Sequence, residues 1–131
     1  MSEGLPPVST PPREAAPESA IEALSELLAA IDDCVDRLHE ARDRAEELVN
    51  QRHDGRSWLQ IVSAETRPLV VETISAVLST LSRAGSAWRR EEALALRAEN
   101  VSINRIAGLF GVTRQRISAL LRERGAADDQ G

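Results

Sequence analysis

The chain has 131 residues, which suits one small domain or a small domain with an extension. Its single cysteine excludes an intrachain disulfide and a cysteine-based zinc site, and its net charge of −5 argues against a protein that coats DNA regardless of sequence. The charge is uneven, because residues 1–82 hold 7 Arg and 15 acidic residues whereas residues 83–124 hold 9 Arg and 4 acidic residues. No apolar run is long enough to span a bilayer and no secretory signal is present, so we expect a cytoplasmic protein without a membrane partner.

Two segments make up the first part of the chain. Residues 1–17 contain five of the six prolines and are expected to form a disordered tail. Ser19 and Glu22 form a capping-box pattern ahead of a long helix of about residues 20–51. Its apolar residues follow a coiled-coil heptad spacing of 3, 4, 3, 4 and 3; this heptad stripe consists of Ile21, Leu24, Leu28, Ile31, Val35 and Leu38. The stripe buries itself either on a second copy, which we favour, or along the chain's own helices.

Three further helical segments are expected between residues 57 and 98. Residues 57–64 form a short helix that offers Trp58, Leu59 and Val62 to the core. A helix of about residues 67–83 begins at Pro68, which suits a first helical turn. Gly85 separates it from a helix of about residues 87–98, unless one long helix runs through this glycine. Residues 18–84 are thus interpreted as a helical dimerisation region and residues 85–124 as a second domain, followed by a disordered acidic tail at 125–131.

The last third of the chain predicts two helices joined by a tight turn. Ile103, Ile106 and Phe110 share one face of the first helix. Gly111 is free to adopt the left-handed backbone that ends this helix, and Thr113 is a suitable N-cap for a second helix of about residues 114–123. The residues expected to build the pair are Ile106, Ala107, Phe110, Gly111, Val112, Ile117 and Leu120. The fold class is therefore all-α.

Residues 102–124, above all the segment IAGLFGVTRQRIS, resemble the helix-turn-helix of bacterial transcription regulators. The segment is also similar to the DNA-binding ends of resolvase-type recombinases and sigma factors. The resemblance covers about the last third of the chain, and it implies a three-helix unit whose last helix enters the major groove of DNA. The first two thirds resemble no family known to us.

The polar side of the second helix carries side chains suited to duplex DNA. Arginine can pair with guanine and glutamine with adenine, a small hydroxyl makes shorter contacts, and a methyl group can meet thymine. The residues expected to read bases are Arg114, Gln115, Ser118 and Ala119. Phosphate contacts are expected from side chains and helix N-termini around this face; the candidates are Ser102, Asn104, Arg105, Thr113, Arg116, Arg122, Arg89 and Arg90.

The sequence therefore predicts a homodimeric transcriptional regulator that binds double-stranded DNA and associates with the nucleoid when bound. Two reading units imply a pseudo-palindromic site with half-sites about 10 base pairs, or a multiple, apart. The alternative is a coiled-coil adaptor or anti-regulator whose helix-turn-helix docks another regulatory protein. No nucleophile turn or phosphate loop is present, so no enzyme activity, cofactor or metal is expected.

Overall fold

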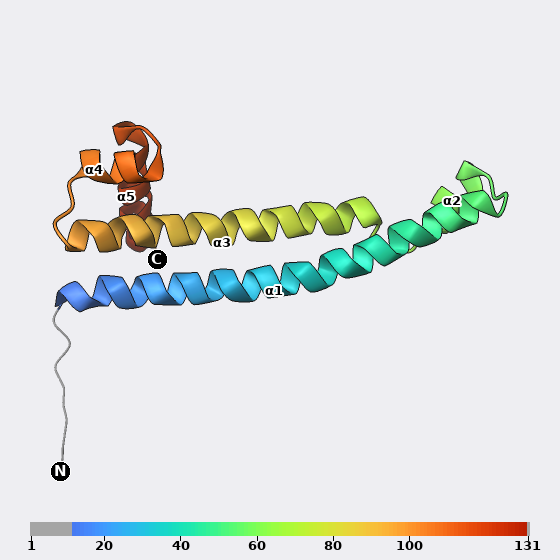
Figure 1. Cartoon of the computed structure of the whole chain (residues 1–131), viewed down its shortest axis with the longest axis horizontal. Helices are drawn as coiled ribbons and strands as arrows, with labels where there is room; N and C mark the ends of the chain where they lie inside the picture. The colour runs from blue at the N-terminus through green and yellow to red at the C-terminus, as the bar shows by residue number, and fades with distance from the viewer. Residues whose placement is uncertain (1–11, 131) are drawn as a thin grey trace, which may run out of the picture. The chain divides into compact units, whose positions relative to one another are not determined.

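A computed structural model describes the backbone of residues 12–130 and the side chains of residues 19–123 (Figure 1). Within this part of the chain all regular structure is helical, which confirms the all-α fold class. The helices are α1 Pro12–His53, α2 Trp58–Ala64, α3 Val70–Ala98, α4 Ile103–Phe110 and α5 Arg114–Gln130. None of the described helices is both long and apolar enough to cross a membrane.

The chain divides into two compact units. The central unit comprises residues 27–84, and the terminal unit comprises the described residues up to 26 together with those from 85 onward. Helices α1 and α3 each contribute to both units. The sequence predicted a boundary between residues 84 and 85, which is also a boundary between the two units. Residues 18–26 were predicted to belong to the helical region 18–84, whereas in the structure they belong to the terminal unit.

The helices extend further toward both ends of the chain than the sequence predicted. Helix α1 begins at Pro12, inside the segment that was expected to be a disordered tail of residues 1–17. Residues 1–11 of that tail lie outside the described part of the chain. Helix α5 continues to Gln130, so most of the expected acidic tail at 125–131 is helical backbone.

In the central unit, α1 and α3 touch through small side chains. Cys34 is 2% exposed, and its thiol donates to the carbonyl oxygen of Val77 at 3.8 Å. Nearer the end of α1, the Arg44 guanidinium donates to the carbonyl oxygen of Thr66, just before α3. Arg44 follows Cys34 along the chain, whereas its partner Thr66 precedes Val77, the partner of Cys34. The two helices are therefore antiparallel here, as Figure 1 also shows. Cys34 is thus a buried thiol inside one chain.

Helix α2 is placed by a complete capping box. The Gln60 amide donates to Ser57 Oγ at 3.1 Å, and the Ser57 amide donates to Gln60 Oε1 at 3.0 Å. Ile61 is then the one side chain of this short helix that is buried. The expectation that Trp58, Leu59 and Val62 enter the core is wrong, because they are 57%, 78% and 64% exposed.

Helix α3 runs without interruption through Gly85, so the continuous-helix alternative is correct and two separate helices are not formed. It begins at Val70 rather than near residue 67. Carboxylates cover its first amides: the Val70 amide donates to Glu65 Oε2 and the Leu69 amide to Glu72 Oε1, both at 2.8 Å. These bonds satisfy N–H groups that have no partner within the helix.

The heptad stripe of α1 lies on the surface of the chain. Its six residues are between 39% and 63% exposed, the extremes being Leu24 and Ile21. The buried face of α1 is offset by one residue and carries smaller side chains, namely Ala20, Ala23, Cys34 and Ala41. The chain's own helices therefore do not bury the stripe, which was one of its two expected burial sites.

Candidate nucleic-acid interface

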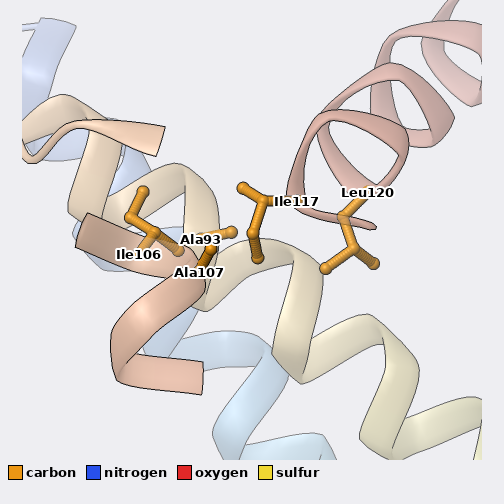
Figure 2. Packing of buried hydrophobic residues seen from close by; sticks show 5 residues of the cluster. All are labelled: Ala93, Ile106, Ala107, Ile117 and Leu120. Atoms are coloured by element: carbon orange, nitrogen blue, oxygen red, sulfur yellow. The ribbon is translucent and has the colours of Figure 1, made fainter. Parts of the chain in front are cut away.

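A small apolar cluster holds three helices of the terminal unit together (Figure 2). Its members, between 0% and 7% exposed, are Ala93 from α3, Ile106 and Ala107 from α4, and Ile117 and Leu120 from α5. Leu96, Val101, Ile103, Phe110 and Leu121 pack around it, partly buried. Because Ile117 and Leu120 point into the cluster, the opposite face of α5 is directed outward.

The helices that precede α4 and α5 end in the same way. Asn100 and Gly111 both have left-handed backbone, with φ of 67° and 70°. The following amide reaches back to a carbonyl five residues earlier, from Val101 to Leu96 and from Val112 to Ala107, at 3.0 Å in each case. This pattern satisfies carbonyl groups at a helix C-terminus. The expected left-handed Gly111 is thus confirmed.

The starts of α4 and α5 are also alike. Ser102 Oγ accepts a hydrogen bond from the Arg105 amide, and Thr113 Oγ1 accepts one from the Arg116 amide, both at 3.1 Å. The expected cap at Thr113 is therefore confirmed. The segments NVSINRIA and GVTRQRIS, which begin at Asn100 and Gly111, form a repeat that the sequence analysis missed. The recurring pair of valine and a capping hydroxyl, followed by Arg-Ile, was its visible signal.

Three of the four expected base-reading residues line one hollow on α5, and Ala119 is not among its lining residues. Arg114 and Gln115 are exposed, whereas Ser118 and Ala119 are half-buried. Arg114, Gln115, Ser118 and Arg122 together line this hollow of about 340 Å³. Gln115 and Arg122 lie on the side of α5 away from Ile117 and Leu120, whereas Arg114, one turn before Ile117, borders the buried side and is exposed at the start of the helix. Arg116 lies between the hollow and the buried side, on a flank of the helix.

The arginines near this face fall into two groups. Arg105, Arg114, Arg116 and Arg122 are exposed, and no ion pair joins any of them to another described residue. Arg89 instead lies over the Phe110 ring, 4.2 Å from its centroid, with Glu92 at 4.0 Å. Arg90 stands 4.0 Å from Glu123. The four exposed arginines of α4 and α5 are therefore the more accessible positive charges.

The remaining expected residues have mixed outcomes. Asn104 is exposed at the start of α4. The hydroxyl oxygens of Ser102 and Thr113 act as caps, so these groups fix the helix starts whatever else they contact. Val112 was expected to build the helix pair, but it is 40% exposed, because its place in the turn directs it away from the buried cluster.

The chain matches no known family model, and no curated protein or solved structure is significantly similar to it. Within the described part of the chain, no three His, Cys, Asp or Glu side chains are grouped in a way that could hold a metal ion.

Proposed function

We propose that the terminal unit binds double-stranded DNA in a sequence-selective manner through α5, and that the protein is a transcriptional regulator. One observation supports this above all: Arg114 and Gln115 are exposed on α5 while Ile117 and Leu120 are buried, and no ion pair joins Arg114 to another described residue. In this proposal α3, α4 and α5 form a helix-turn-helix unit whose last helix enters the major groove.

Base recognition falls to the hollow on α5. Arg114 donates two hydrogen bonds to guanine O6 and N7, and Gln115 makes a paired contact with adenine N6 and N7. Ser118, one turn further along the same face, makes a shorter polar contact with a base edge. Such contacts act on base edges alone, so they determine which sequence is bound rather than how strongly any duplex is held.

Phosphate contacts surround the reading face. Arg105 and Arg116 occupy equivalent positions in the repeated helix starts, each as the third residue after its capping hydroxyl. The start of each helix is the positive end of its dipole, which favours an anion. Arg122 adds a further exposed positive charge. The acidic residues 1–82 oppose binding to random DNA, so affinity depends on the right base sequence.

Selection from a random duplex library tests the proposal. The parent protein should enrich a defined motif, and Arg114→Ala or Gln115→Ala should weaken binding to it by about 1–3 kcal/mol and relax the sequence at one position. Arg56→Ala removes an exposed arginine of the central unit and serves as the matched control, with unchanged affinity expected. Enrichment of no motif, or equal affinity of all variants, would refute the proposal.

Docking of a protein partner is the rival function. Leu109 and Val112 favour it, because they leave 58% and 40% of their surface exposed beside the turn. Salt separates the two functions: binding through about six phosphates weakens steeply as the salt concentration rises, whereas an apolar docking surface is much less sensitive. Binding that is insensitive to salt and lost in Leu109→Gln would favour the rival.

A further inference from the structure

The central unit carries an apolar face that nothing in the described chain covers. It is made of residues from two helices, each between 39% and 66% exposed. We call it the outer face; it consists of Leu28, Ile31, Val35 and Leu38 on α1 and Val71, Ile74 and Leu78 on α3. The sequence drew attention to the α1 residues, but it did not connect them with α3.

The two sets of residues lie on the same side of the helix pair. Cys34 of α1 and Val77 of α3 face each other. Each residue of the outer face comes one position after such a facing residue, as Val35 follows Cys34 and Leu78 follows Val77. One residue turns an α-helix by about 100°. Because the helices are antiparallel, this turn is clockwise on one and anticlockwise on the other when both are viewed from the same end. Both sets therefore rotate toward a common side and form one continuous layer.

The size of the outer face suits a second copy of the chain. Val, Leu and Ile side chains each have about 100 Å² of apolar surface, so seven of them at these exposures leave on the order of 400 Å² uncovered per copy. Two such faces together offer about 800 Å². A standard interface of about 1,200–2,000 Å², roughly 65% apolar at its core, needs about 800–1,300 Å² of apolar surface. The apolar surface of two outer faces therefore equals the lower limit of what a standard interface needs.

We propose that the outer face packs against the outer face of a second copy, so that α1 and α3 of both copies form a four-helix bundle. Two-fold symmetry makes such a contact self-complementary. The spacing of 3 and 4 residues on both helices is the spacing by which helices of a bundle interlock. The proposal concerns the central unit alone and does not depend on DNA binding.

Charge determines which helices meet across the bundle. The α1 edge of the outer face carries the exposed Asp32 and Asp36, whereas the α3 edge carries the exposed Ser75 and Ser79. The carboxylate of Glu72, at the end of the α3 edge, is paired with Arg67. Packing α1 on α1 of the second copy in the antiparallel direction would set carboxylate against carboxylate, which is unfavourable. Packing α1 on α3 of the second copy sets carboxylates beside hydroxyl groups, which can donate to them. The bundle therefore pairs α1 with α3 across the interface.

Sedimentation of the full chain without DNA tests the proposal. The parent should be a dimer, and Leu28→Glu with Leu78→Glu should raise the dimer dissociation constant at least about 100-fold, because buried charges replace apolar contacts. These two leucines are 59% and 63% exposed, so the isolated chain tolerates the change and should keep its helical content. Leu59→Glu is the matched control: Leu59 is 78% exposed on α2, outside the outer face, and its replacement should leave the dimer intact.

A parent that sediments as a monomer, or a dimer equally weakened by Leu59→Glu, overturns the proposal. Mixing two variants tests the pairing even if the double variant unfolds. Val35→Lys and Leu78→Glu should each weaken their own dimers, yet the mixture should form a dimer because opposite charges meet between α1 and α3. No gain on mixing refutes this pairing. Since no DNA is present, failure here leaves the proposed DNA contact untouched.

Discussion

Replacing Gly108, inside α4, and Gly111, at its C-cap, by alanine should change stability in opposite directions. Gly111 has φ of 70°, and an added Cβ would meet no heavy atom within 4 Å. The whole effect of Gly111→Ala is therefore backbone strain, which costs about 1–2 kcal/mol. Gly108 lies inside α4 and also has open space around an added Cβ. Gly108→Ala therefore gains about 1 kcal/mol of helix propensity.

The two variants should differ by about 2–3 kcal/mol in free energy of unfolding, although they are three residues apart. Urea unfolding followed by circular dichroism measures this difference. Gly111→Asn is a control for the conformation, because asparagine tolerates left-handed backbone, and it should be more stable than Gly111→Ala. If Gly111→Ala proves as stable as Gly108→Ala, the reasoning about this turn is wrong.

Three further predictions concern the same helices. Ser102→Ala and Thr113→Ala should each lower the free energy of unfolding by about 1 kcal/mol in urea titrations, and no change would show that the caps are not formed. Ile117→Ala should cost about 2–5 kcal/mol, since the residue is 0% exposed, and a smaller loss would contradict its burial. Arg105→Ala and Arg116→Ala should each reduce the salt dependence of DNA binding by about one phosphate contact, and unequal effects would refute their equivalence.

Local signals made the α4–α5 pair predictable. A left-handed glycine, a capping threonine and apolar residues at helical spacing all point to the same structure there, and each is readable within a few residues. Ile106 and Ile117 are fully buried as expected. The exposure of Gln115 follows from the same helical periodicity, because Gln115 lies opposite Ile117, whereas Arg114 is exposed because it opens the first turn of α5.

The continuity of α3 could not be read from the residues around Gly85. Glycine inside a helix costs only about 1 kcal/mol relative to alanine, which packing along a helix of 29 residues readily offsets. The expectation of a helix end at Gly85 overestimated this cost. A substitution there thus acts on an ordinary helical position, with open space around an added Cβ.

The residues that α1 and α2 bury within the chain were not predicted, for a shared reason. Sequence reasoning favours the largest apolar side chains, yet Ala41 and Cys34 are buried while Val35 and Leu38 are exposed. Small side chains let α1 approach its neighbours closely, so the neighbouring set of larger residues is left outside. On α2 the capping box fixes the rotation of a single short helix, which allows Ile61 alone to reach the interior.

Methylation interference at guanine N7 tests the central claim most directly, because it reports on the atom that Arg114 is proposed to contact. On the selected duplex, methylation of one guanine in each half-site should abolish binding by the parent protein and have little further effect on Arg114→Ala. Interference at the same guanine that is equally strong for the parent and Arg114→Ala, or no interference at any guanine, would contradict the account.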